Sequence, residues 1–182
     1  MGKDKALIHY HGQAQQYHLY DLLQPYCQQV FISCRKEQIP KHENEANQNY
    51  AFIADKYDNI GPLGGLLSAF EFDSRVGWLV IACDMPYIND LAVDYLIKNR
   101  KKEMMTTAFK NLNQGFGEPL FTIWESRSYS ILLKAFFKKS YSLRKILNQH
   151  PTHLLTPPNE NILKNINFPK DYQQTMNELG KA

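Results

Sequence analysis

Two aspartates stand where apolar segments of the chain give way to turns. Asp84 directly follows the apolar run Leu79–Cys83, and Asp55 ends a shorter run of β-forming residues. In open parallel sheets, ligands bind beyond the carboxyl ends of the strands, so a carboxylate there is placed to hold Mg²⁺ on a phosphate. An aspartate that only bonds to its own turn is the alternative for both residues. The two carboxylates are therefore candidates for a phosphate and metal site.

A glycine-rich segment, Gly61-Pro62-Leu63-Gly64-Gly65, precedes a stretch with helical periodicity. The free N–H groups and the dipole of a helix start attract anions or polar base edges, and glycine lets a ligand approach the backbone. The segment is not a Walker loop, because no Gly-Lys-Ser/Thr follows it. Tight packing of the helix start is the alternative.

Basic side chains occur near the N-terminus and in the second half of the chain. Lys3 and Lys5 flank Asp4, and an ammonium group near phosphates would stabilise the negative charge of phosphoryl transfer. A solvated terminus is the alternative. A later basic stretch is typical of a solvated helix face but could also receive an anionic substrate. It contains Lys134, Lys138, Lys139, Arg144 and Lys145. The six histidines lack the spacing of a metal site.

Short β-like runs alternate with amphipathic helical stretches along the chain, which predicts a three-layer α/β domain. The predicted strands are Val30–Cys34, Tyr50–Ala54, Gly77–Cys83 and Glu118–Trp124. The predicted helices are Gln15–Leu23, Leu63–Phe72, Asn89–Arg100, Ser128–Lys138 and Pro169–Leu179. The run from Gly77 to Cys83 is apolar without alternation, which indicates a strand covered on both faces, as in a parallel sheet. No linker or repeat divides the chain, so residues 1–182 are expected to form one domain.

Composition narrows the class of protein. The chain has 182 residues, of which 43% are apolar, and a net charge of +3. This length suits a single domain with its own core, and the charge is too small to favour a nucleic-acid partner. Three scattered cysteines, the lack of a signal peptide and the lack of a long apolar run predict a cytoplasmic protein with no membrane partner.

Five ordered segments resemble the nucleotidyltransferase family that includes molybdenum cofactor guanylyltransferase. The N-terminal segment Met1–Leu7 is similar to the second half of the family signature Leu-Ala-Gly-Gly-x-Ser-x-Arg-Met-Gly-x-Asp-Lys-Ala-Leu. Four later segments are similar to further family elements in the right order. They are Gly61–Gly65, Ala82–Tyr87, Glu118–Phe121 and Asn165–Asp171.

The resemblance implies a Rossmann-like α/β/α sandwich with a mostly parallel sheet and a reaction at its strand ends. That reaction joins GMP from GTP to the phosphate of molybdopterin and releases pyrophosphate. Lys5 and Asp84 would be catalytic, with Asp84 holding Mg²⁺, and Asn165 and Asn167 would lie on the pterin side. The nucleotide would contact Lys5, Asp55, Gly61, Pro62, Leu63 and Asp84. Other proteins of cofactor biosynthesis and molybdoenzyme chaperones are the further partners that the resemblance implies.

The chain departs from the family pattern in two places. It reads Ser33-Cys34-Arg35 where the family often has Asn, and the glycine-rich first half of the signature, with its strand, does not precede Met1. We therefore expect a domain shortened at its N-terminus, with Met1 as the internal methionine of the Arg-Met-Gly step. A sister enzyme that uses CTP or a sugar phosphate, and a non-catalytic nucleotide- or pterin-binding remnant, are the alternatives.

Overall fold

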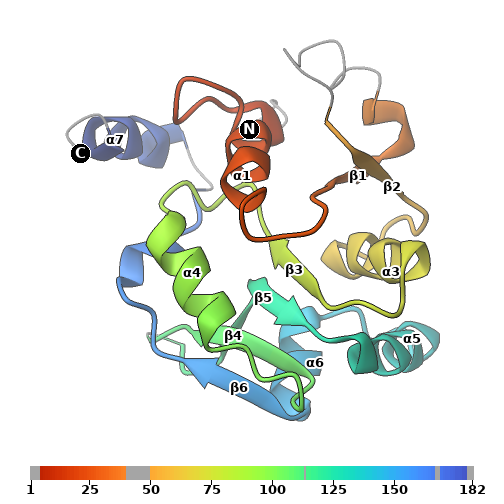
Figure 1. The fold of residues 1–182 in the computed structure, drawn as a ribbon. Helices are drawn as coiled ribbons and strands as arrows, with labels where there is room; N and C mark the ends of the chain where they lie inside the picture. The colour runs from red at the N-terminus through yellow and green to blue at the C-terminus, as the bar shows by residue number, and fades with distance from the viewer. Residues whose placement is uncertain (1–4, 40–49, 113, 167–168, 180–182) are drawn as a thin grey trace.

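Helices and strands alternate through most of the chain, as the sequence predicts (Figure 1). The computed structural model describes residues 5–39, 50–112, 114–166 and 169–179. Its strands are β1 (Ile32–Arg35), β2 (Phe52–Asp55), β3 (Trp78–Ile81), β4 (Thr106–Lys110), β5 (Gly117–Trp124) and β6 (Thr152–Leu155). Its longer helices are α1 (Gln15–Leu23), α3 (Pro62–Phe72), α4 (Asp90–Lys98), α5 (Tyr129–Phe137), α6 (Leu143–Gln149) and α7 (Pro169–Leu179). The domain is of the α/β class.

The described strands form two separate sheets. In the smaller sheet, β1 and β2 pair in parallel. The larger sheet has the order β3-β5-β4-β6, in which β5 runs antiparallel to both neighbours and β4 pairs with β6 in parallel. The pairing is therefore mixed, whereas the resemblance implied a mostly parallel sheet. The expectation for Gly77–Cys83 also needs correction, because β3 pairs with the antiparallel β5 and its four residues are only partly buried.

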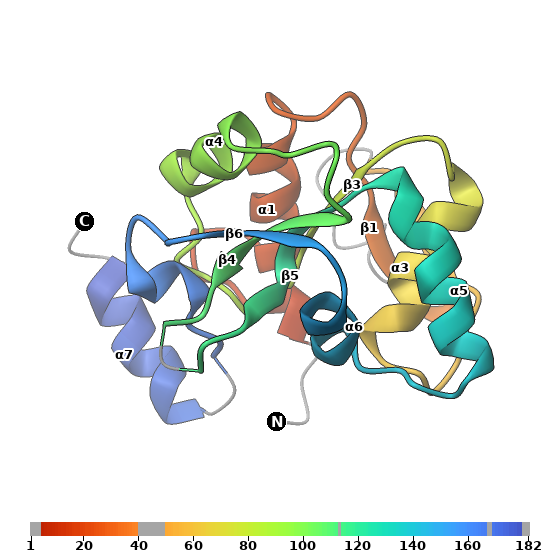
Figure 2. The same cartoon turned by 90° about the horizontal axis from the view of Figure 1, so that it is seen from below.

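Neighbouring residues of the larger sheet point into different cores, which gives the domain its three layers. Phe109 and Ile123 join a cluster with α1 and α4, whereas Ala108 and Trp124 join a cluster with α3, α5 and α6. This alternation follows from the two-residue period of a strand. Figure 2 shows α4 over one face of the larger sheet and α6 over the other.

Helix ends follow the local chemistry of the sequence. Asn89 caps α4, because its side-chain oxygen accepts a hydrogen bond from the backbone N–H of Ala92 at 3.1 Å. Pro62 occupies the first turn of α3, where a missing N–H costs nothing. The bounds of α1 and α7 match the predicted ranges.

The last helix connects the end of the chain to its beginning. The Tyr87 hydroxyl donates to Thr175 Oγ1 at 3.2 Å, and the Tyr172 hydroxyl donates to the carbonyl of His9 at 3.1 Å. The first contact ties α7 to the turn after β3, and the second holds it beside the segment that precedes α1 (Figure 1). None of the helices in the described ranges is long and apolar enough to cross a bilayer.

Candidate functional site

A cavity of about 410 Å³ lies at the carboxyl ends of three strands. The end of β1, the end of β2 and Cys83, just after β3, all contribute to its lining. The lining residues are Ala6, Gln16, Ser33, Cys34, Arg35, Gln38, Asp55, Tyr57, Asp58, Asn59, Gly61 and Cys83. This is the edge at which α/β sheets bind ligands. Two of the predicted nucleotide contacts, Asp55 and Gly61, therefore share one cavity.

The Asp55 carboxylate is held by a neighbouring strand and approached closely by α3. The Ser33 hydroxyl donates a hydrogen bond of 2.6 Å to Asp55 Oδ1 across the parallel pair. A Cβ atom at Gly65 would lie 2.7 Å from Ser33 Oγ and 3.3 Å from Asp55 Oδ1. Gly65 thus allows α3 to pack on this polar pair, which is the packing role considered for the glycine-rich segment.

The start of α3 faces the same cavity. Gly61 has φ +63°, a left-handed conformation that favours glycine, and it turns the chain into the helix. Pro62 lines the larger groove that adjoins the cavity. The side chain of Leu63 is fully buried in the core, so this residue reaches a ligand only through its backbone. Pro62 has no N–H, and the Gly64 N–H donates to the Gly61 carbonyl at 2.9 Å, so the N–H of Leu63 is the first-turn donor that can meet an anion or a base edge.

Asp84 lies one residue beyond the cavity lining, in the turn after β3. Its backbone carbonyl accepts a hydrogen bond of 2.8 Å from the N–H of Ile166. This bond brings the neighbouring residue Asn165, which is exposed, to the same edge of the sheet as Asp84. The predicted pterin-side residue Asn167 lies outside the described residues. Asp84 and Ile166, which are 82 positions apart in the sequence, are thereby joined at one end of the sheet.

The N-terminal segment begins at the same edge. The backbone of Lys5 starts the short 3-10 helix Lys5–Leu7, and Ala6 lines the cavity. The side chain of Lys5 lies outside the described part of the chain. Its predicted role at the triphosphate stays a prediction.

Two groups near Asp84 were not among the predicted site residues. Burial raises the pKa of Tyr10 to about 12, with Tyr172 and then Asp84 adding to the rise. Burial also raises the pKa of the Glu118 carboxyl, while the Leu120 N–H and Arg144 oppose the shift and Asp84 adds to it. Glu118 lies in a segment that resembles a family element, and the presence of a carboxylate in that segment was the signal available in the sequence. Tyr10 offers no comparable signal in the sequence.

The few carboxylates near Asp84 suit a divalent ion that is bound partly by substrate phosphates. They do not suit an ion that protein side chains hold alone. Within the described ranges, no group of three or more His, Cys, Asp or Glu residues is arranged to hold a metal. Mg²⁺ is commonly bound through one or two carboxylates, with substrate phosphates and water completing its shell. Asp84, whose charge adds to the raised pKa of the nearby Glu118 carboxyl, fits that pattern.

Solved structures share this fold across the whole chain. The molybdopterin-guanine dinucleotide biosynthesis protein A of Archaeoglobus fulgidus matches with a TM-score of 0.80 at 19% identity, covering 100% of this chain and 93% of its own. A 2-C-methyl-D-erythritol 4-phosphate cytidylyltransferase from Thermus thermophilus matches with a TM-score of 0.71 at 11% identity, covering 98% and 95%. The fold is that of the nucleotidyltransferases, which confirms the predicted Rossmann-like sandwich.

Sequence comparison gives the family. Residues 1–154 match the MobA-like NTP transferase domain, and the chain belongs to that family. A molybdenum cofactor biosynthesis bifunctional protein of Synechocystis is 37% identical over 174 residues, which cover 96% of this chain and 49% of the relative. The chain thus spans about half the length of that relative. A molybdenum cofactor guanylyltransferase of Pseudomonas entomophila is 26% identical, with 93% of this chain and 87% of the relative covered.

Proposed function

We propose that this chain transfers GMP from GTP to the terminal phosphate of molybdopterin and releases pyrophosphate. The observation that carries the proposal is the cavity at the ends of β1, β2 and β3, with Asp55 and Gly61 in its lining and Asp84 beside it. The names of the Pseudomonas and Archaeoglobus relatives support guanine as the base and molybdopterin as the acceptor. They favour GTP over the CTP and sugar-phosphate alternatives.

The proposed step is an in-line displacement at the α-phosphorus of GTP. An oxygen of the molybdopterin phosphate forms the new bond to that phosphorus, and the bond to the bridging α–β oxygen breaks as pyrophosphate leaves. Both reactants are anions, so the site must hold them together against their repulsion. Bound Mg²⁺ would neutralise phosphate charge, and Asp84 is the residue that would hold it.

The protein's own groups divide between the two substrates. The backbone N–H of Leu63 at the start of α3 and the Asp55 carboxylate orient the nucleotide, with Asp55 fixed by Ser33. The Lys5 ammonium stabilises charge on the triphosphate. Asn165 and Asn167 contact the pterin, which enters along the edge where the Ile166 N–H meets the Asp84 carbonyl.

We place the proposed reaction in the cytoplasm. The three cysteines all lie in the described ranges and all are thiols, which suits a reducing compartment. Other proteins of molybdenum cofactor biosynthesis and molybdoenzyme chaperones are the proposed further partners.

Pyrophosphate release tests the proposal. The protein is incubated with molybdopterin and Mg²⁺, and with GTP, CTP or ATP in separate reactions. We expect release with GTP at a rate at least tenfold above the other two nucleotides. Equal or faster release with CTP would overturn the choice of guanine. GTP binding without pyrophosphate release would instead favour the non-catalytic binding module.

A further inference from the structure

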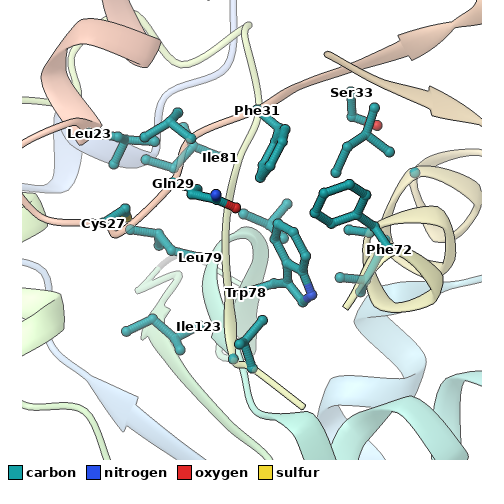
Figure 3. Close-up of a pocket in the computed structure, with 18 of the residues that line it drawn as sticks. Leu23, Cys27, Gln29, Phe31, Ser33, Phe72, Trp78, Leu79, Ile81 and Ile123 are labelled. Atoms are coloured by element: carbon teal, nitrogen blue, oxygen red, sulfur yellow. The ribbon is translucent and has the colours of Figure 1, made fainter. Parts of the chain in front are cut away.

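Phe137 is a large apolar side chain on the surface of the molecule. It lies in the last turn of α5, and 77% of it is exposed. The exposed residues Phe72 and Val76, by contrast, line a groove of about 1390 Å³ between the two sheets, where Figure 3 shows Phe72 beside Phe31 and Trp78. Phe137 lines neither this groove nor the smaller cavity. A single exposed apolar residue is ordinary, so the surroundings of Phe137 decide what it means.

Polar and basic side chains surround Phe137 on the solvent-facing side of α5. At 3.6 residues per turn, Lys134 and Lys138 share its side of the helix, and Ser130 extends that side by one turn. All four residues are exposed. Leu132, on the opposite side, is fully buried in the core that α5 shares with α3 and α6. The exposed side, made of Ser130, Lys134, Phe137 and Lys138, is named the α5 face.

The segment that contains this face carries positive charge without negative charge. Residues 126–159 include six of the 21 Lys and Arg residues and no Asp or Glu, so their net charge is +6. The rest of the chain holds the other 15 basic residues and all 18 acidic ones, which makes −3. The segment includes α5 and α6, which pack on each other (Figure 2). The small net charge of the whole chain therefore hides a strongly basic surface.

The lysines of this surface form no ion pair in the described part of the chain. Lys98 on α4 pairs with Asp94 at 2.8 Å, whereas Lys134, Lys138 and Lys139 have no carboxylate within 4.0 Å in the described ranges. Lys134 and Lys138 are one turn apart, so their like charges weaken the helix. The helix dipole favours cations at a C-terminus, but it gives no reason for an exposed aromatic ring among them.

The turn that ends α5 adds a third cation beside Phe137. Lys139 has φ +56°, a left-handed conformation that favours glycine. Its N–H donates to the Phe136 carbonyl, and the Ser140 N–H donates to the Ala135 carbonyl, both at 2.9 Å. These bonds close the helix end. Glycine would suit the backbone better at this position, and lysine supplies charge there instead.

The α5 face ends beside the candidate functional site. The Phe136 ring meets the ring of Tyr57 with centroids 5.0 Å apart, and Tyr57 lines the small cavity. The rings of Phe136 and Phe137 are 5.5 Å apart. A molecule that covered Phe137 would therefore lie next to that cavity.

The chemistry of this surface selects among possible occupants. Carboxylates would neutralise the three lysines, and an apolar side chain between them would cover the aromatic ring. A two-fold contact of the face with a second copy would set lysines against lysines. Membrane-binding helices present a full apolar stripe, and proteins that bind single-stranded nucleic acid present several aromatic rings along a basic groove. The α5 face has one ring on an exposed helix, which favours an acidic protein segment.

We propose that the α5 face, together with Lys139, is a docking surface for an acidic segment of a partner protein with an apolar side chain at its centre. The apolar side chain covers Phe137, and carboxylates on either side of it pair with Lys134, Lys138 and Lys139. The aromatic ring then lies inside a polar rim, as in small transient interfaces. This inference goes beyond the proposed function and does not require nucleotide transfer.

Three fluorescein-labelled peptides test the proposal with the full chain. The first is Glu-Asp-Glu-Leu-Phe-Glu-Asp-Glu, the second has Ser-Ser in place of Leu-Phe, and the third has Lys in place of every acidic residue. Fluorescence anisotropy measures their Kd at about 0.15 M salt, where long-range attraction is screened. The protein variants are Phe137→Ser and Lys139→Gly. Leu91→Ser on α4 is the matched control, because Leu91 is also 77% exposed.

We expect saturable binding of the first peptide at least tenfold tighter than that of the other two. Phe137→Ser should weaken this binding at least fivefold, and Leu91→Ser should change it less than twofold. Lys139→Gly should weaken binding at least threefold and yet raise the urea midpoint, because glycine relieves the left-handed turn. A purely structural role for Lys139 would move the midpoint and leave the binding unchanged.

Equal binding of the first two peptides would overturn the proposal, because charge alone would then explain it. Equal effects of Phe137→Ser and Leu91→Ser would also overturn it. The same holds if Phe137→Ser abolishes a dimer, tighter binding of oligothymidylate or tighter binding of phosphatidylserine vesicles, since each result would assign the face to another occupant. These readouts involve no nucleotide transfer, so the proposed function can fail independently.

Discussion

Single side chains at this candidate site take their positions from where the strands end. Asp55 ends β2 and is fixed by Ser33 from β1, whereas Asp84 lies in the turn after β3. Both positions were predicted from apolar runs followed by an aspartate. The Ser33 contact was not predictable, because the pairing of β1 with β2 places these residues side by side although they are 22 positions apart.

Replacing Asp84 with Asn removes the charge proposed to hold Mg²⁺ and keeps the shape of the side chain. We expect Asp84→Asn to lower the rate of pyrophosphate release at least 100-fold, with an unchanged urea midpoint. Asp94→Asn is the matched control, because Asp94 pairs with Lys98 on the surface of α4 and should keep full activity. Unchanged turnover in Asp84→Asn would remove this residue from the mechanism.

The unpartnered amide of Gln16 predicts a stabilising substitution. Gln16→Leu should raise the free energy of unfolding by about 1–2 kcal/mol, since it removes a buried polar group that gains no hydrogen bond. Urea denaturation measures the change. Gln24→Leu, at an exposed position just after α1, should alter stability by less than about 0.5 kcal/mol. A loss of stability in Gln16→Leu would show that the amide is satisfied in solution.

At the scale of elements, amphipathic helices were predicted better than strands. The 3.6-residue periodicity predicted α1 and α7 with their bounds. The strands β4 and β6 and the helix α6 were missed. Thr106 of β4 and Thr152 of β6 are polar in sequence, but they bond to each other through their hydroxyls at 2.8 Å. Tertiary pairing satisfies these polar groups, and no local pattern indicates it.

Packing of α3 on the β1–β2 pair predicts that two substitutions are coupled. Gly65→Ala alone should lower stability, because the new Cβ meets Ser33 Oγ and displaces its bond to Asp55. In a Ser33→Ala background, Gly65→Ala should instead raise stability by about 1 kcal/mol through helix propensity. Urea denaturation of the four proteins measures the coupling. Additive effects would contradict the close contact.

A histidine on α1 predicts a pH dependence of stability. Burial, together with His11 stacked at 3.8 Å, lowers the pKa of His18 from its usual 6.5. Unfolded His18 therefore takes up a proton near pH 6.5, whereas the folded protein takes it up only at lower pH, so stability falls as the pH drops below about 6.5. His18→Gln should reduce the loss of unfolding free energy between pH 7 and pH 5. His150→Gln is the control, and an undiminished loss in His18→Gln would contradict this account.

For the whole molecule, the fold class followed from the sequence, but the division of the sheet did not. Alternating runs predicted the three layers, and the family resemblance placed the site at the strand ends. The two sheets and the groove between them depend on which edges pair, which periodicity does not encode. The half-buried residues of β3 were expected to be covered on both faces, and the groove explains why they are not.

The transfer of the α-phosphate from GTP tests the central claim most directly. The protein is incubated with molybdopterin, Mg²⁺ and GTP that carries ³²P at either the α or the γ position, and the pterin product is isolated. The proposed displacement predicts that the α label appears in the pterin product and that the γ label leaves entirely as pyrophosphate. Transfer of the γ label, or no label in the pterin with either substrate, would contradict it.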